Sequence, residues 1–323
     1  MNISELLHLP RLTDDLDRVE DALRRSVGSE DPFLGEVAAH LIVAGGKRIR
    51  PVLAVAAAAV GGTAVTEDVA QGAVSVELVH LGSLYHDDVM DNATTRRGVE
   101  SVNARWGNLV AIVAGDFLLA RASEIAAGLG TEVAGLLAAT IGRLCEGQVG
   151  EVQSAFNPAR TETSYLNAIS GKTASLMAAA CRIGAITGGL DRGLVDAVTA
   201  FGDNFGMAFQ IRDDVLDFVG TDAELGKPAG HDLMEGVYTL PVIRAVAVPS
   251  AGGELRALLG GPLDEPARDK AVEIVRSSGA LDASLMVARR YADTAAEALA
   301  GIPGDGAASL AAFAHHLLDE IPA

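Results

Sequence analysis

The sequence predicts an all-α protein, and three observations support that class. The chain has 323 residues, of which 49% are hydrophobic but only 4% aromatic, and alanine and leucine, which favour helix over strand, are abundant. Apolar residues recur at helical spacing along most of the chain, and no stretch alternates as a half-buried strand does. No shift in composition marks a boundary, so we expect a single domain over residues 1–323.

The expected helices follow one another with short breaks, and the breaks carry the residues that end helices. In the first half they are 12–27 and 33–44 before the glycine pair at 45–46, 50–60 before the pair at 61–62, 67–91, 107–129 and 131–155. In the second half they are 162–187 after Asn157-Pro158, 191–219 after GGLD at 188–191, 238–248, 264–279, 281–300 and 305–319. The Gly- and Pro-rich segment 220–241 is the longest expected loop, and such loops usually carry function.

Charge and hydropathy exclude several classes of protein. The formal net charge is −18, from 25 Lys and Arg against 43 Asp and Glu, so nucleic acid is not an expected partner. The longest apolar stretch, at 51–65, is too short to span a bilayer. The start of the chain shows no secretion signal. Cys145 and Cys181 have no metal-ligand spacing, and we expect both to be buried thiols in a reducing, cytoplasmic environment.

Two short acidic motifs share one spacing, HDDVMD at 86–91 and RDDVLD at 212–217. Their carboxylates belong to Asp87, Asp88, Asp91, Asp213, Asp214 and Asp217. On a helix, the first and last aspartate of each motif stand about 6 Å apart along one face. Like charges that close repel one another unless a cation neutralises them. One motif alone would suit a solvated helix end, whereas the repeat favours a shared function.

Facing pairs of carboxylates are oxygen ligands for hard cations, and Mg²⁺ is usual where phosphates complete the shell. Acid–base work by two carboxylates, as in glycosidases, needs only one on each side. The basic residues near glycines and near these motifs indicate a diphosphate site, although each alone would be an ordinary surface charge. They are Lys47, Arg50, Arg96, Arg97, Lys172 and Lys227. His80, two turns before Asp87, is either a hydrogen-bonded core residue or a phosphate ligand.

Taken in order, the motifs resemble those of the trans-isoprenyl diphosphate synthases, the polyprenyl synthetase family. They are GGKRIRP at 45–51, ELVHLGSLYHDDVMDNATTRRG at 77–98, GDF at 115–117, GKTASL at 171–176, FQIRDDVLD at 209–217 and GKPAGHDL at 226–233. The likeness is close over about residues 40–245 and looser elsewhere. It implies a bundle of mostly antiparallel helices around a deep central cavity, usually in a homodimer.

The resemblance also implies a reaction. Isopentenyl diphosphate would be joined head to tail to an allylic diphosphate, such as farnesyl or geranylgeranyl diphosphate, to give a trans-polyprenyl diphosphate. The six motif aspartates would hold Mg²⁺, with three ions when substrate is bound. The residues that would hold the allylic diphosphate are Arg96, Lys172 and Lys227. Those for isopentenyl diphosphate would be Lys47, Arg50, His80 and Arg97. Thr173 and Gln210 would stabilise the carbocation.

Product length in this family is set beside the helix that precedes the first motif. The corresponding wall here consists of Ser75, Val76, Val79, Gly82 and Ser83, with Phe117 as an alternative floor. No aromatic residue plugs the first turn, and the step from Asp87 back to Val76 spans roughly 16 Å. A medium or long chain is the first expectation for the product, and geranylgeranyl diphosphate is the second.

Some positions depart from the family pattern or leave alternatives open. Val237 stands where many relatives have lysine, and the C-terminus lacks the basic ending of some relatives. Asp232 either joins the second metal site through its outer shell or caps the next helix. A terpene cyclase would be expected to keep one aspartate motif and lack the isopentenyl diphosphate residues. A non-catalytic subunit of a heteromeric synthase would be expected to lose aspartates.

Overall fold

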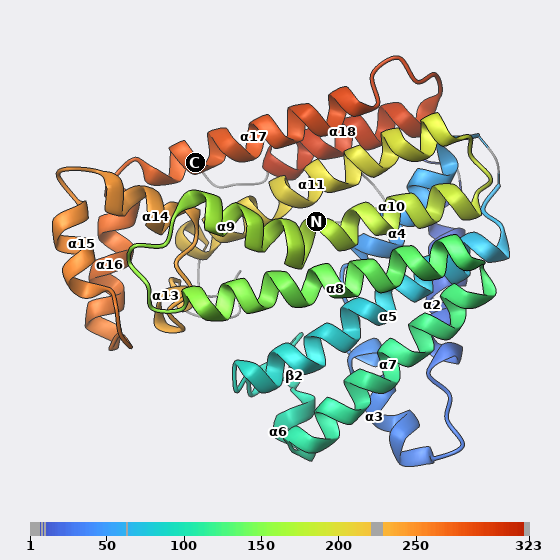
Figure 1. Ribbon diagram of the computed structural model, residues 1–323, viewed down its shortest axis with the longest axis horizontal. Coiled ribbons are helices and arrows are strands. Elements are labelled where there is room, and N and C mark those ends of the chain that lie inside the picture. Colours follow the sequence, from blue (N-terminus) through green and yellow to red (C-terminus); the bar gives the residue numbers. More distant parts are fainter. Residues whose placement is uncertain (1–6, 8, 10, 63, 221–228, 320–323) are drawn as a thin grey trace. The chain divides into compact units, whose positions relative to one another are not determined.

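The computed structural model describes residues 7, 9, 11–62, 64–220 and 229–319. Within these ranges the chain is helical apart from loops and one short hairpin, which confirms the predicted class (Figure 1). The elements are α2 (Leu12–Ser26), α3 (Pro32–Val43), α4 (Ile49–Ala59), α5 (Glu67–Met90), β1 (Thr95–Arg96), β2 (Val99–Glu100), α6 (Val102–Trp106), α7 (Asn108–Gly128), α8 (Thr131–Ser154), α9 (Glu162–Ile169), η1 (Ser170–Ala174), α10 (Ser175–Thr187), α11 (Arg192–Val219), α13 (His231–Met234), α14 (Leu240–Ala247), α15 (Gly252–Leu258), α16 (Glu265–Ser277), α17 (Ala280–Ala298) and α18 (Asp305–Asp319).

Most predicted helices begin and end within two residues of the observed ones. The segment predicted as one helix over 162–187 is instead α9, the π-helical turn η1 and α10. The short helices α6, α13 and α15 and the β1–β2 hairpin were not predicted, because elements of two to seven residues are too short to establish a period. The expected loop over 220–241 contains α13 and the start of α14.

Contacts divide the chain into two compact units, which are described separately. The first comprises Met1–Ile141, Leu176–Gly202 and Ala298–Ala311. The second comprises Gly142–Ser175, Asp203–Glu297 and Ala312–Ala323.

In the first unit, α5 packs against α2, α4 and, most extensively, α7 (Figure 1). Glycine allows a close approach of α5 to α7, because a Cβ on Gly82 would lie 3.0 Å from the Gly115 carbonyl oxygen. At the start of α5, the Thr66 side chain accepts a hydrogen bond from the Val69 amide and caps the helix. These contacts fix the helix whose C-terminal end carries the first aspartate motif.

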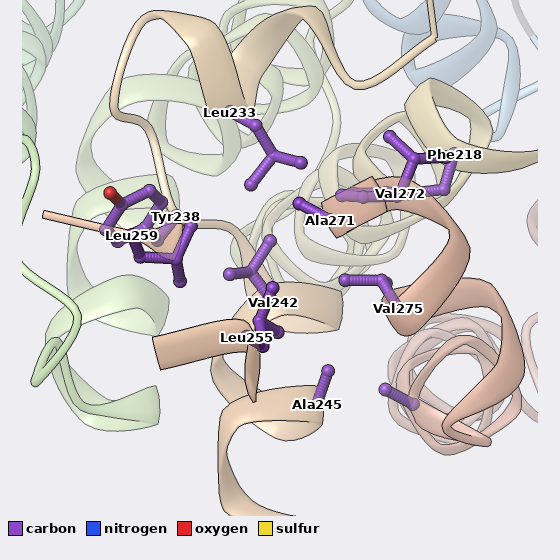
Figure 2. Close-up of a cluster of buried hydrophobic side chains, with 11 residues drawn as sticks. Phe218, Leu233, Tyr238, Val242, Ala245, Leu255, Leu259, Ala271, Val272 and Val275 are labelled. Carbon is purple, nitrogen blue, oxygen red and sulfur yellow. The ribbon is translucent and has the colours of Figure 1, made fainter. Parts of the chain in front are cut away.

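In the second unit, the C-terminal half of α11 is packed by two apolar clusters. Figure 2 shows the first, in which Phe218 of α11 lies among side chains of α13, α14, α15 and α16. It comprises Phe218, Leu233, Tyr238, Val242, Ala245, Leu255, Leu259, Ala271, Val272, Val275 and Ala280. The second comprises Tyr165, Ile169, Ala174, Met207, Ile211, Leu240, Val287 and Ala288. Burial of this apolar surface holds in place the end of α11 that carries the second motif.

The two cysteines differ, which corrects one expectation. Cys181 is fully buried, and burial raises the pKa of its thiol to about 12. Cys145 of α8 is exposed and not buried as predicted, because it lies on an α8 face shared with the exposed Val149 and Val152. Among the residues that the structure describes, no helix combines the length and the apolar character needed to cross a bilayer.

Candidate active site

The first aspartate motif lies at the C-terminal end of α5. Asp87 and Asp88 belong to its last turn, and the amide of Asp91, the residue after the helix, donates to the Asp87 carbonyl at 2.8 Å. That turn contains no basic residue. The C-terminus of a helix carries partial negative charge, so carboxylates there destabilise it. Three carboxylates at this end therefore point to a function that a cation completes.

The β1–β2 hairpin returns Arg96 to this motif. Arg96 Nε donates to Asp88 Oδ1 at 2.7 Å, and Nη2 lies 2.5 Å from the same oxygen. Asp88 is fully buried; burial raises the pKa of its carboxyl, and Arg96 opposes that shift. By contrast, Asp87 is half-buried and Asp91 exposed. Tertiary structure thus divides the motif into one inward carboxylate and two outward ones.

The predicted isopentenyl diphosphate residues gather around the glycine turn that precedes α4. Lys47 is exposed and Arg50 half-buried. Arg97 Nη1 donates to the Leu41 carbonyl at 2.9 Å and also to the Gly45 carbonyl. Burial, followed by the charges of Arg50 and Arg97, holds the pKa of His80 well below its ordinary value. The structure therefore brings His80, Arg50 and Arg97 together, with Lys47 on the same turn.

The depressed pKa of His80 predicts how stability depends on pH. Below the unfolded-state pKa of about 6.5, the unfolded chain binds a proton at His80 that the folded chain does not, so this residue lowers stability as pH falls from about 7 towards 5. The slope is at most about 1.4 kcal/mol per pH unit. His80→Gln removes the pH dependence of stability that comes from His80. Arg48, Arg96 and the other charged groups around this position remain.

Urea unfolding of both proteins at pH 7.5 and pH 5.5 measures the difference. The wild type is expected to lose about 1 kcal/mol more than His80→Gln between the two pH values. Equal losses in the two proteins would contradict the neutral state assigned to His80 near pH 7.

The second aspartate motif lies at the C-terminal end of α11, again with no basic residue in the last turn. Asp213 is half-buried and accepts a hydrogen bond from Arg212 Nη1 at 3.0 Å. Asp214 is buried, and its oxygens accept from Tyr165 Oη at 2.5 Å and Gln210 Nε2 at 2.8 Å. Burial raises the pKa of Asp214 well above its ordinary range, against the effect of these two donors. In both motifs the middle aspartate is held inward, but in the second motif Asp217 is buried as well.

The π-helical turn η1 presents Lys172 and Thr173. Such turns widen a helix locally and are frequent at functional sites. Here α8 comes so close that a Cβ on Gly147 would lie 2.6 Å from the Lys172 amide nitrogen. Lys172 Nζ donates to Glu151 at 2.7 Å, and Thr173 Oγ1 donates to Gln210 Oε1 at 2.7 Å. A continuous chain of hydrogen bonds therefore links η1 through Gln210 to Asp214.

Three residues that contact these side chains were not predicted: Glu77, which lies 3.8 Å from Arg97, Glu151 and Tyr165. Glu77 had a weak signal, since it is an acidic residue between apolar neighbours inside the helix predicted over 67–91. Tyr165 is one of only four tyrosines, and Glu151 had no signal that separated it from other surface acids. Their partners lie between 20 and 49 positions away in the chain, beyond the reach of local spacing.

Other predicted residues have the following places. Lys227 lies outside the described residues. Asp232 lies within α13, whose N-cap is Gly230, so the alternative prediction that Asp232 caps this helix is wrong. The negative charge of Asp232 contributes to the raised pKa of Asp214. Asp217 is buried, and its carbonyl accepts a hydrogen bond from the Gly230 amide at 2.9 Å. Val237 is half-buried.

The proposed product wall follows α5. Val76, Val79 and Ser75 are buried and Ser83 is half-buried. Gly82 faces α7, where Leu119 and the Gly115 carbonyl contact it. Phe117 on α7 is half-buried, with the Arg121 guanidinium 5.9 Å from its ring centroid.

The motifs suit a hard divalent cation in their donor chemistry. Their ligands are carboxylate oxygens, which Mg²⁺ and Ca²⁺ prefer, and the buried Asp88 Oδ2 has no hydrogen-bond partner among the described residues. Within the same residues, no three His, Cys, Asp or Glu side chains are grouped to hold a metal ion. Oxygen atoms of a substrate, such as those of a diphosphate, would complete the shell.

Comparisons with known proteins agree on one family. The pattern of the polyprenyl synthetase family matches residues 31–275. The chain is 42% identical over 301 residues to "Heptaprenyl diphosphate synthase component 2" of Geobacillus stearothermophilus, covering 93% of each chain. It is 38% identical to the nonaprenyl diphosphate synthase of Mycobacterium tuberculosis, covering 88% of this chain and 86% of that one. A crystal structure of a polyprenyl synthase from Caulobacter crescentus, complexed with calcium and isoprenyl diphosphate, matches with a TM-score of 0.92 and 35% identity over 99% of this chain and 98% of that one.

Proposed function

Because this chain belongs to the polyprenyl synthetase family, we propose that it extends an allylic diphosphate with isopentenyl diphosphate to a trans-polyprenyl diphosphate of medium or long chain. The chain is a prenyltransferase, as its relatives' names indicate. The observation that carries the proposal is the pair of aspartate motifs at helix C-termini that lack basic residues in the last turn. The two motifs together hold six carboxylates, and bound cations would offset their mutual repulsion beyond what Arg96 and Arg212 supply.

Divalent metal is part of this chemistry, and we assign it to Mg²⁺. Mg²⁺ bound by these carboxylates would stabilise the negative charge that develops on a departing diphosphate. In the first motif, Asp87 at the end of α5 and Asp91 just after it reach solvent and would bind Mg²⁺; in the second motif, Asp213 of α11 would do so. Asp88 and Asp214 would keep the outward residues in place through Arg96 and Tyr165. Asp217 would be a further metal ligand. Three Mg²⁺ ions would bind per active site when substrate is present.

The diphosphates would be bound by the basic residues already located. Lys47, Arg50, His80 and Arg97 would take isopentenyl diphosphate at the glycine turn. Arg96, Lys172 and Lys227 would take the allylic diphosphate, and Thr173 and Gln210 would place their oxygens near the carbocation. A neutral His80 still donates one ring N–H to an oxygen.

A medium or long product is favoured over geranylgeranyl diphosphate by two observations. The relatives compared above are named for heptaprenyl and nonaprenyl products. The wall along α5 is built from Ser75, Val76, Val79, Gly82 and Ser83, which are small or aliphatic. The direct test is incubation with Mg²⁺, isopentenyl diphosphate and farnesyl or geranylgeranyl diphosphate, with product lengths read by mass spectrometry. A ladder ending at one long chain is expected; absence of elongation by the purified chain would contradict a synthase that acts without a second component.

Ser83→Phe is expected to shorten the product, because an aromatic ring one turn before Asp87 closes the wall near the reaction centre. The first condensation should continue at a rate within severalfold of the wild type. Product lengths are again read by mass spectrometry. Ser123→Phe on the exposed side of α7 is the control, and it should leave the distribution unchanged. An unaltered product length in Ser83→Phe would place the wall elsewhere.

The active form would be a cytoplasmic homodimer. A patch of α7 formed by Leu109, Ile112 and Val113 is exposed and apolar, which supports self-association. The relative from Geobacillus stearothermophilus is named as one component of a synthase, so a second protein is the alternative partner. Light scattering on the purified chain should give twice 33.2 kDa together with full activity. A monomer that is inactive alone would favour the partner-dependent subunit.

A further inference from the structure

Glu77 is a carboxylate inside α5 with 1% of its surface exposed. Two guanidiniums approach the same oxygen, Oε1: Arg48 Nη1 lies at 3.1 Å and Arg97 Nη2 at 3.8 Å. The charge of Arg50 acts on it as well. Burial raises the pKa of the carboxyl, and these three arginines lower it. A carboxylate is rarely buried unless paired, so its placement at the centre of a basic cluster requires an explanation.

Arg48 uses each of its five N–H donors on partners within the described residues. Nε and Nη2 donate to Glu20 at 2.8 and 3.2 Å, and Nη1 donates to Glu77. The remaining two donors go to the carbonyls of Ile42 at 3.0 Å and Gly45 at 3.4 Å. A guanidinium has five donors and no acceptor. Arg48 is therefore saturated by protein groups and has no donor left for a ligand.

Arg97 contacts the same turn from the other side. Its Nη1 donates to the carbonyls of Leu41 and Gly45. A Cβ on Gly46 would lie 2.8 Å from the Arg97 guanidinium carbon, so a larger residue there would displace this guanidinium. Arg48 and Arg97 also have left-handed backbones, with φ of 49° and 55°, which are uncommon for residues other than glycine. Both guanidiniums meet at the Gly45 carbonyl and at Glu77.

We propose that Glu77 is a positioning residue, which holds Arg48 and Arg97 together so that the 45–50 turn presents Lys47 and Arg50 to the diphosphate of isopentenyl diphosphate. This inference rests on the function proposed above. Lys47 directly follows Gly45 and Gly46 and is exposed. Arg50 lies in the first turn of α4. Glu77 contributes no contact to substrate; it acts through the arginines. A carboxylate supplies this support because it accepts a hydrogen bond from Arg48 and its charge attracts Arg97 as well.

A simple electrostatic role for Glu77 makes the opposite prediction. Removal of a negative charge beside a diphosphate site by itself strengthens anion binding. Loss of support for the turn weakens anion binding. Mutation of residues that support a ligand shell typically lowers affinity or activity by 10- to 100-fold. Glu77→Gln, which keeps the shape and removes the charge, therefore separates the two roles by the sign of the change.

Calorimetric titration with isopentenyl diphosphate gives the dissociation constant without turnover, and steady-state rates give KM for each substrate. Glu77→Gln is expected to weaken isopentenyl diphosphate binding and raise its KM about tenfold. The allylic KM and the saturated kcat should stay within about threefold. Arg48→Lys keeps the positive charge but has three donors in place of five. It should change isopentenyl diphosphate binding and KM as Glu77→Gln does. Arg24→Lys is the control, because Arg24 also pairs with Glu20 but is largely exposed.

Each outcome supports or overturns the proposal. Unchanged or tighter binding in folded Glu77→Gln overturns it, as does a loss shared equally by both substrates. If Glu77→Gln does not fold, Arg48→Lys carries the same test. Wild-type protein that binds isopentenyl diphosphate but elongates nothing would refute the proposed function alone, since the titration does not depend on catalysis. Faster hydrogen exchange at the amides of residues 46–50 in either variant is the independent sign of a loosened turn.

Discussion

Asp87→Ala is expected to lower kcat by about 1000-fold or more while the helical circular dichroism stays unchanged. Asp87 is an outward carboxylate of the first motif, and it would bind the Mg²⁺ that stabilises the departing diphosphate. Loss of one preorganised electrostatic contact at a reaction centre costs about 100- to 1000-fold, and loss of a metal costs more. The fold should not suffer, because removing a carboxylate from a helix C-terminus relieves an unfavourable charge.

Asp68→Ala is the matched control for this measurement. Asp68 lies on the same helix, is exposed, and occupies its first turn, where negative charge is favourable. This variant should keep its activity and lose a few tenths of a kcal/mol of stability. Turnover is measured with radiolabelled isopentenyl diphosphate over a range of Mg²⁺ concentrations. Near-normal turnover of Asp87→Ala at every Mg²⁺ concentration would remove Asp87 from the metal site.

Gly184→Ala is expected to destabilise the protein by about 3 kcal/mol, at the upper end of the usual range for overpacked cores. A Cβ at this position of α10 would lie 2.0 Å from the carbonyl oxygen of Ala54 in α4. Because the obstacle is backbone, no change of rotamer relieves the clash, and α4 and α10 must separate. One turn later, a Cβ on Gly188 would lie 3.1 Å from the Cβ of Ala58, so the two helices cross through small residues.

Gly128→Ala in α7 serves as its control, since nothing lies within 4 Å of a Cβ there. That change should leave stability unchanged or raise it by up to about 1 kcal/mol, because alanine favours helix over glycine. Thermal unfolding of both variants gives the comparison, with Gly184→Ala lowered by several degrees. Equal melting temperatures would mean that α4 and α10 do not approach as closely as described.

The helices were predictable because each is a local pattern. The 3.6-residue period, the caps and the glycine breaks located most of them within two residues. The same spacing placed Gln210 on the face of Asp214, and their hydrogen bond confirms it. Prediction failed where several short elements interrupt a period. The π-helical turn at 170–174 is an example: it lies where Gly171 closely approaches Gly147 of α8, and no residue type in the sequence indicates that contact.

For this protein, the sequence by itself determined the all-α class, both aspartate motifs at helix ends and the basic residues around the glycine turn. These features depend on residues a few positions apart. Only the tertiary structure decided which residues face solvent and which support them. Asp88 is paired with Arg96 and Asp214 with Tyr165. All five N–H donors of Arg48 are bonded to Glu20, Glu77 and two carbonyls. Such choices follow from burial, because a buried charge must find its partner wherever the fold brings one, at any distance along the chain.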